Sequence, residues 1–328
     1  MVPDASLLLK TDPVTLPTPL ARVIAARGPL RRAAEACPAC GGRETVLVSP
    51  EIKGREGFGV VGCVACGLGR LDPLPSQLEG YYHSNAYQLE KNPGQDISQV
   101  RAQPRKREDL ERRWSRVARL CVPGSRILDV GCGSGGLLHA ARERSSALVC
   151  GVEPHEEFRT QLTQDGFQVR RSLSECAGER YDAVLLFHVL EHVENPVQFL
   201  REIRPLLKPG GTLVAEVPSM TDALLWVYTI PPFWKFYWQY PHVWYFSPPP
   251  LGRVLERAGY AVERLECMQR YGLRNHLQWL NDGVPGPGER FADLVSAAMD
   301  QDYRAALVRR GAGDTVWAES RVSEPCAA

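Results

Sequence analysis

Four cysteines near the N-terminus have the spacing of a metal site. In the pattern C-x2-C, 22 intervening residues, C-x2-C, they are Cys37, Cys40, Cys63 and Cys66. Thiolates are soft ligands that suit zinc, and a tetrahedral site takes four of them. Four protein ligands leave no open position for a substrate. We therefore expect a structural zinc that stabilises a small module.

Other interpretations of these cysteines are a dithiol redox pair, thiols without metal, or a module that grips nucleic acid. The flanking loops carry few aligned basic or aromatic residues. The formal net charge of +1 gives no general attraction to nucleic acid or to an anionic membrane. Nucleic acid is therefore not the partner that we expect.

A second candidate site is the string FHVLEHVENP at residues 187–196. His188, Glu191 and His192 form an H-x-x-E-H pattern, which in one class of peptidase holds zinc on a helix face. An asparagine–proline pair at 195–196 is typical of a helix N-cap followed by the first helical residue. The helix should thus begin after the pattern, which argues against a peptidase.

A glycine-rich loop, DVGCGSGG at residues 129–136, lies between an apolar stretch and a segment with helical spacing. Glycines let the backbone approach a ligand, and a helix N-terminus offers free N–H groups. The loop also fits a dinucleotide fingerprint, but Asp129 would repel a pyrophosphate and attract an ammonium group. Glu153, after the next apolar stretch, can accept both hydroxyls of a ribose. A ligand with a ribose, a cationic amine and no phosphate is S-adenosylmethionine.

The elements that must position these residues alternate from Arg126 onward. Predicted strands cover 126–131, 147–154, 181–187 and 212–218, and predicted helices cover 136–144 and 197–207. This alternation predicts a parallel α/β sheet with helices on both faces. Such sheets bind ligands at the carboxyl ends of their strands, where Asp129, Glu153 and His188 would meet.

In order, these blocks resemble the class I S-adenosylmethionine-dependent methyltransferases over residues 120–265. The blocks are ILDVGCGSGGLL, GVEP and YDAVLLFHVLEHVENPVQFLREIRPLLKPGGTLVAEVP. The resemblance implies a Rossmann-like α/β fold, with a seven-stranded, mostly parallel sheet whose last strand is antiparallel. It also implies S-adenosylmethionine as cofactor and methyl transfer as the reaction.

The resemblance further implies which residues bind the cofactor. Its methionine part would be lined by the loop glycines Gly131, Gly133 and Gly135. Asp129 would contact the amino end, and Glu153 would bind the ribose. Ser172 or Leu173, after the third strand, would lie near the adenine.

The H-x-x-E-H residues then have several open roles. His188 can contact cofactor or substrate, or act as a general base. Glu191 and His192 can brace the turn, act on the substrate, or bind a divalent metal such as Mg²⁺; bracing is favoured, and the metal is favoured least. Related ubiquinone-pathway and RNA 2′-O-methyltransferases carry similar elements, some associated with metal. Candidate catalytic residues are His188, His192 and also His242.

Residues 226–246 contain eleven of the 27 aromatic residues of the chain. This stretch could be a packed core or dimer seam, a lid over the substrate, or a shallow membrane contact suited to a lipid-linked substrate. The lid is favoured, with Trp234, Trp238 and Tyr245 as substrate-binding residues that stack on the substrate.

The 328 residues divide into five predicted parts. These are a flexible arm (1–30), a zinc-ribbon-like module (31–76), a helical lead-in (77–120), the methyltransferase domain (121–272, with an aromatic insertion at 222–247) and a helical C-terminal extension (273–328). Ten cysteines without a disulfide-like pattern, and no secretory signal, suit the cytoplasm. No apolar stretch is long enough for a transmembrane helix.

We therefore expect an enzyme that methylates a small molecule, such as a sugar or natural product, on oxygen, nitrogen or carbon. One alternative is an RNA methyltransferase that grips nucleic acid with the cysteine module. The other is a non-catalytic, cofactor-binding partner. The oligomeric state is left open.

Overall fold

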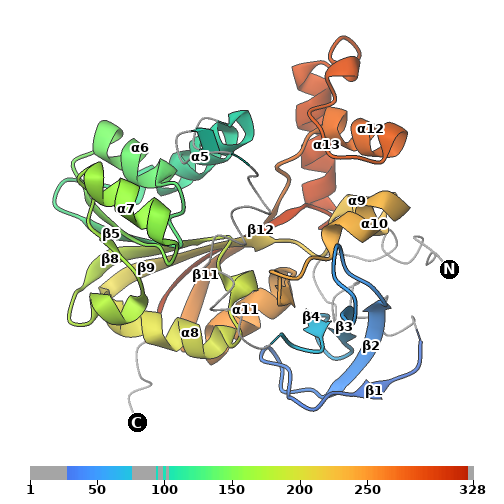
Figure 1. Cartoon of the computed structure of the whole chain (residues 1–328), viewed down its shortest axis with the longest axis horizontal. Helices are drawn as coiled ribbons and strands as arrows, with labels where there is room; N and C mark the ends of the chain where they lie inside the picture. The colour runs from blue at the N-terminus through green and yellow to red at the C-terminus, as the bar shows by residue number, and fades with distance from the viewer. Residues whose placement is uncertain (1–27, 76–93, 95–98, 101–102, 324–328) are drawn as a thin grey trace.

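The computed structural model describes residues 28–75, 94, 99–100 and 103–323, which form two sheets with surrounding helices (Figure 1). Most of the predicted arm and much of the predicted lead-in lie outside the described residues. The described part of the lead-in contains helix α5 (Pro104–Val117).

The larger sheet has seven strands. In order across the sheet, they are β11 (Tyr260–Met268), β12 (Thr315–Val322), β9 (Leu207–Pro218), β8 (Tyr181–Phe187), β5 (Arg126–Val130), β6 (Leu148–Val152) and β7 (Val169–Arg170). The pairs from β9 to β7 are parallel, whereas β12 is antiparallel to both of its neighbours. The predicted Rossmann-like, mostly parallel sheet with an antiparallel last strand is confirmed.

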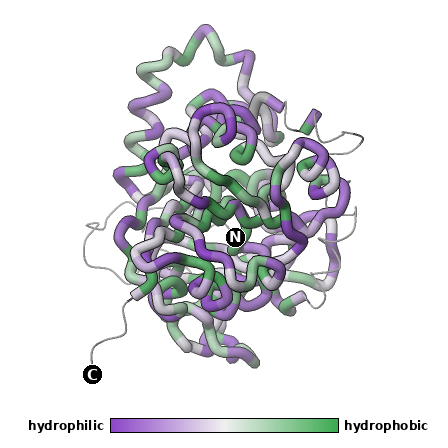
Figure 2. The backbone as a smooth tube through the Cα atoms, turned by 90° about the vertical axis from the view of Figure 1, so that its left-hand side faces the viewer, coloured by the Kyte–Doolittle hydropathy of each residue, from purple (hydrophilic) through white to green (hydrophobic). Residues whose placement is uncertain are grey.

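Helices cover both faces of this sheet. α5, α6 (Gly136–Arg144) and α7 (Glu156–Gln164) lie on one face, and α8 (Pro196–Ile203) and α11 (Pro248–Arg257) on the other (Figure 1). Residues that face either side are therefore buried: Val184 and Leu185 of β8 have no exposed surface. Hydrophobic residues accordingly run through the middle of the molecule (Figure 2).

The smaller sheet joins two regions that are far apart in the sequence. Strands β1 (Arg31–Arg32), β2 (Glu44–Ser49), β3 (Gly59–Cys63) and β4 (Gly69–Asp72) come from the cysteine module. The fifth strand, β10 (Trp244–Tyr245), comes from the aromatic insertion and pairs antiparallel with β4. The rest of the insertion contains α9 (Ala223–Trp226) and α10 (Pro231–Tyr237).

The predicted boundary at residue 272 is wrong. Helices α12 (Leu273–Asp282) and α13 (Ala297–Arg309) project from the domain (Figure 1), and the chain then returns as β12 between β9 and β11. Residues 273–314 are thus an insertion, and 315–322 belong to the sheet. The sequence did not predict β12, because the two helices before it suggested that the whole C-terminal region is helical.

The part of the chain that the structure describes also contains short 3-10 turns. They are η2 (Ala118–Leu120), η3 (Leu173–Cys176), η4 (Leu190–His192), η5 (Arg204–Leu206) and η6 (Glu289–Phe291). Among the described helices, none has the length and apolar character needed to cross a bilayer.

Candidate functional site

The glycine-rich loop connects β5 to α6 in a conformation that requires glycine. Gly131, Gly133 and Gly135 have φ angles of 70°, 54° and 75°, in the left-handed region that side chains disfavour. A Cβ atom on Gly135 would lie 2.2 Å from a methyl of Leu162, and one on Gly131 2.7 Å from a methyl of Val189. The loop therefore presents its backbone at close range to the carboxyl edge of the sheet.

Two buried carboxylates flank this loop. Asp129 and Glu153 lie near the ends of neighbouring strands and are 4% and 6% exposed. Glu153 accepts hydrogen bonds from the backbone N–H groups of Gly133 (2.7 Å) and His155 (2.8 Å). Burial raises the pKa of Asp129 to about 7 and that of Glu153 to about 6. A bound cation would favour the ionised form of Asp129.

The residues predicted to lie near an adenine follow β7 at the same edge. Ser172 and Leu173 are both half-buried, and the Ser172 hydroxyl lies 2.8 Å from the Ser174 hydroxyl. Their position after the third parallel strand matches the one predicted.

His188 lies at the end of β8 with a φ of 59°, a strained value for a residue with a side chain. Its Nδ1 atom is 3.0 Å from Glu191 Oε1. Its Nε2 atom is 3.2 Å from Glu216 Oε1 and 3.1 Å from Arg270 Nη1. Both ring nitrogens therefore face protein groups.

Glu216 was missed by the sequence analysis. It lies on β9, is fully buried, and accepts hydrogen bonds of 2.6–3.0 Å from the guanidinium groups of Arg112 and Arg113 on α5. Burial would raise the pKa of Glu216, but Arg113, His188 and Arg112 outweigh burial and hold that pKa well below its usual range. Its position as the one charged residue in the apolar stretch TLVAEVP could have indicated a functional role.

Arg270, in the connection after β11, was also missed. Besides His188, its guanidinium lies 3.6 Å from Asp109 of α5 and 3.5 Å from Asp314. Arg270 thus links α5, the end of β8 and the start of β12 at one edge of the sheet.

A group of potential metal ligands lies beside His188. Glu191, His192 and His242 each offer one ligand atom, and these atoms lie within 4.8 Å of one another. His192 Nδ1 lies 2.7 Å from the Pro241 carbonyl oxygen, which makes Nδ1 the donor and leaves Nε2 to face Glu191. The buried Oε2 atom of Glu191 has no hydrogen-bond partner among the described residues. Imidazole ligands suit zinc, copper, iron or nickel better than magnesium.

The four cysteines meet as their spacing predicts. The Sγ atoms of Cys37 and Cys66 lie 3.6 Å apart, and those of Cys40 and Cys63 3.5 Å apart. A tetrahedral zinc with bonds of about 2.3 Å would separate its sulfurs by about 3.8 Å. The donor set therefore fits zinc. The cysteine turns pack into the core of the larger domain and do not project from it.

The aromatic insertion is a packed core. Trp238 and Tyr245 are 0% and 2% exposed, and they share a hydrophobic cluster with Val46, Val60 and Leu71 of the module. This burial argues against their predicted substrate-binding role, because neither side chain offers surface to a ligand in this structure. Trp234 is half-buried, and its Nε1 lies 3.3 Å from the Ser49 hydroxyl. Few aromatic side chains of this segment are exposed, which also argues against a contact with a membrane.

The chain has relatives among known proteins. A ubiquinone biosynthesis O-methyltransferase of Xanthomonas campestris pv. campestris (strain B100) is 39% identical over 116 residues, covering 32% of this chain and 48% of the relative. The match thus spans about half the length of that relative. A ubiquinone biosynthesis O-methyltransferase of Cereibacter sphaeroides (strain KD131) is 31% identical over 206 residues, covering 59% of this chain and 77% of the relative.

A solved structure and a family model also match. Magnesium protoporphyrin IX methyltransferase from Synechocystis PCC 6803 aligns with a TM-score of 0.47 and 16% identity, over 75% of this chain and 98% of that one. The family model described as a methyltransferase domain matches residues 102–265, half of the 328-residue chain. This chain belongs to the methyltransferase domain family.

Proposed function

We propose that this protein transfers the methyl group of S-adenosylmethionine to a small molecule. The observation that carries the proposal is the pair of buried carboxylates, Asp129 and Glu153, on either side of a left-handed glycine loop. Together they suit a ligand with an ammonium group and a ribose diol. The two relatives are named as O-methyltransferases, which supports a hydroxyl as acceptor.

The cofactor, when bound, supplies an electrophilic methyl group. The chain's own residues bind the cofactor and orient the acceptor. Asp129 would neutralise the cofactor's ammonium group, and Glu153 would accept hydrogen bonds from its ribose hydroxyls in place of the one from Gly133. Because both nitrogens of His188 already face protein groups, we infer that His188 orients Glu191 and does not accept a proton. His192 and His242 remain the candidates for activating the acceptor.

The affinity for S-adenosylhomocysteine tests the role of Asp129. Protonation removes the charge of Asp129, so the affinity should fall by up to about tenfold per unit as the pH drops below about 7. Asp129→Asn should bind weakly and lose the pH dependence near 7, leaving a smaller dependence near 6 from Glu153. Isothermal titration calorimetry measures both effects.

The matched control is Asp182→Asn. Asp182 bonds Lys208 (2.7 Å) near the start of β8, at the opposite edge of the sheet, and should keep the wild-type profile. Wild-type affinity that does not change across this pH range would contradict the assignment of Asp129. Absence of binding would contradict the proposed function.

We also propose that the four cysteines hold a structural zinc. Metal analysis should find about one zinc per chain. Cys37→Ser should lose it and melt at a lower temperature, because the metal would no longer join the two cysteine turns. Cys121→Ser, which alters a buried cysteine in another hydrophobic cluster, is the control and should retain the metal. A zinc-free wild type that melts cooperatively would refute the assignment.

A second metal at Glu191, His192 and His242 is a further part of the proposal. Such a metal would bring an acceptor hydroxyl close and lower its pKa. The buried, unpartnered Oε2 atom of Glu191 supports this assignment among the described residues. The hydrogen bond from His192 Nδ1 to a backbone carbonyl also supports it, because metal-ligating histidines are commonly oriented in this way.

Cobalt provides the test of this site. Co²⁺ added to the zinc-loaded protein should give visible d–d absorption with one further site per chain, and His242→Ala should weaken that binding at least about tenfold. His139→Ala is the control, because His139 lies on α6 beside Asp165. Absorption that is absent in the wild type, or unchanged in His242→Ala, would exclude the site.

The alternative functions have less support. The inward packing of the cysteine turns leaves little of them for a nucleic acid to contact, which disfavours an RNA methyltransferase. A non-catalytic partner would bind S-adenosylhomocysteine normally, so methyl transfer to a panel of hydroxylated small molecules is the assay that separates it from an enzyme.

A further inference from the structure

We propose that the four-cysteine module is a positioning part of the reaction centre: through β10 it holds His242 and the Glu191–His192 turn in place. The inference rests on the proposed function, because it takes these three residues as the centre. It gives the module a task in catalysis that zinc-mediated stability alone would not.

The module bonds to one side of the segment that carries His242. β4 and β10 pair with Trp244 opposite Arg70 and Tyr245 opposite Gly69. The backbone N–H of Leu71 donates to the Val243 carbonyl at 2.9 Å, and that of Lys53 to the Trp238 carbonyl at 2.8 Å. Residues 238–245 are therefore bonded to the module at both ends.

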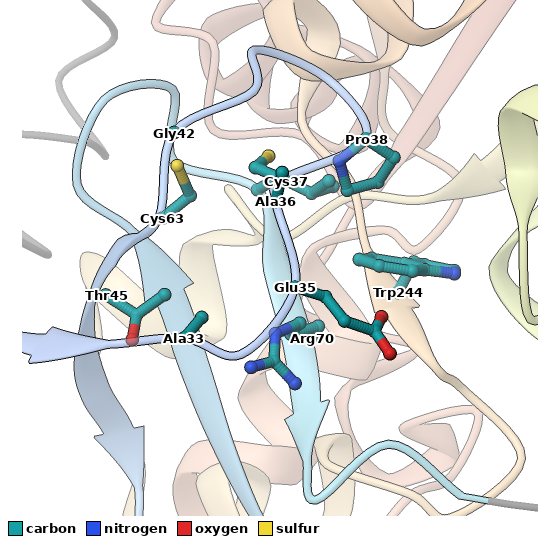
Figure 3. A pocket seen from close by; sticks show the side chains of 11 residues that line it. Ala33, Glu35, Ala36, Cys37, Pro38, Gly42, Thr45, Cys63, Arg70 and Trp244 are labelled. Atoms are coloured by element: carbon teal, nitrogen blue, oxygen red, sulfur yellow. The ribbon is translucent and has the colours of Figure 1, made fainter.

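The other side of the same segment forms hydrogen bonds with the Glu191–His192 turn. His192 Nδ1 donates to the Pro241 carbonyl at 2.7 Å. The Trp244 indole N–H donates to the carbonyl of Val193, the residue after His192, at 2.8 Å. The Trp244 ring also lines a pocket with Cys37 and Pro38 of the first cysteine turn (Figure 3). The Trp244 side chain thus lines a pocket beside the first cysteine turn and also bonds to the loop that presents His192.

Close packing makes this connection rigid. A Cβ atom on Gly69 would lie 2.8 Å from Met220 Sδ and 3.0 Å from Tyr245 Cβ. Gly69 thus lets β4 approach β10, and a larger residue would push the two strands apart. The module and the insertion also share one hydrophobic core, so a displacement of the module moves the segment with it.

Two variants separate this positioning role from zinc binding. Trp244→Phe keeps an aromatic ring but removes the N–H that bonds Val193. Gly69→Val displaces β10 while all four cysteines remain. Trp279→Phe is the matched control, because this buried indole packs on Phe233 and Phe236 in the same core, at ring distances of 4.9 and 5.1 Å.

Four measurements are made on the full-length, zinc-loaded chain. These are zinc content, S-adenosylhomocysteine affinity, Co²⁺ affinity at the second site, and the ¹H–¹⁵N signal of the His192 ring N–H. Both test variants should keep one zinc and bind S-adenosylhomocysteine within about twofold of wild type. Each should lose the protected ring N–H signal and bind Co²⁺ about ten- to a hundredfold more weakly, the usual effect of losing an outer-shell partner.

The outcomes test the positioning role separately from the second metal and from the proposed function. Wild-type ring N–H signal and Co²⁺ affinity in Trp244→Phe would overturn the positioning role, even if Gly69→Val fails to fold. Equal losses in Trp279→Phe would also overturn it, since any core change would then suffice. If wild type binds no Co²⁺, the second metal fails, while the ring N–H signal still decides the positioning role. If wild type binds no S-adenosylhomocysteine, the proposed function fails.

Discussion

The buried charge of Glu216 is the constraint on which the site depends. An ionised carboxylate without solvent is tolerated only when cations and hydrogen bonds surround it, and removing one partner of such a group costs on the order of 3–5 kcal/mol. Arg112, Arg113 and His188 supply these partners. To do so, α5 must lie against the carboxyl edge of the sheet, and the chain must turn sharply after β8.

That turn connects Glu216 to the rest of the site. One ring nitrogen of His188 lies 3.2 Å from Glu216 and 3.1 Å from Arg270, and the other lies 3.0 Å from Glu191. Glu191 in turn faces His192 and His242, which the cysteine module holds from the far side. A continuous set of polar contacts thus runs from α5 to the strand that the module contributes. The left-handed backbone at His188 is consistent with a geometry imposed by these neighbours.

Features that depend on neighbouring residues could be predicted from the sequence. The glycine loop, the carboxylates after two strands, the helix that begins after Asn195 and the cysteine pairs all have local patterns. Asn195 caps α8 as expected, accepting a hydrogen bond from the Gln198 N–H at 3.0 Å. The order and direction of the strands then followed from the resemblance to known methyltransferases.

Features that depend on distant residues could not be predicted. Glu216 pairs with arginines more than 100 positions earlier in the chain. No local sequence pattern around Glu216 or these arginines predicts that they pair. β12 returns to the sheet only after a helical insertion. The aromatic residues at 226–246 suggested a lid because the sequence does not reveal that a strand of the cysteine module pairs with this segment and lets it form a shared core.

A crystal structure of the full chain with S-adenosylhomocysteine tests the central claim most directly. The ribose hydroxyls should lie within hydrogen-bond distance of Glu153, the amino group should face Asp129, and the ligand should contact the backbone of Gly131–Gly135. A ligand bound elsewhere, or a ribose held by other residues while Glu153 keeps its bond to Gly133, would contradict that claim.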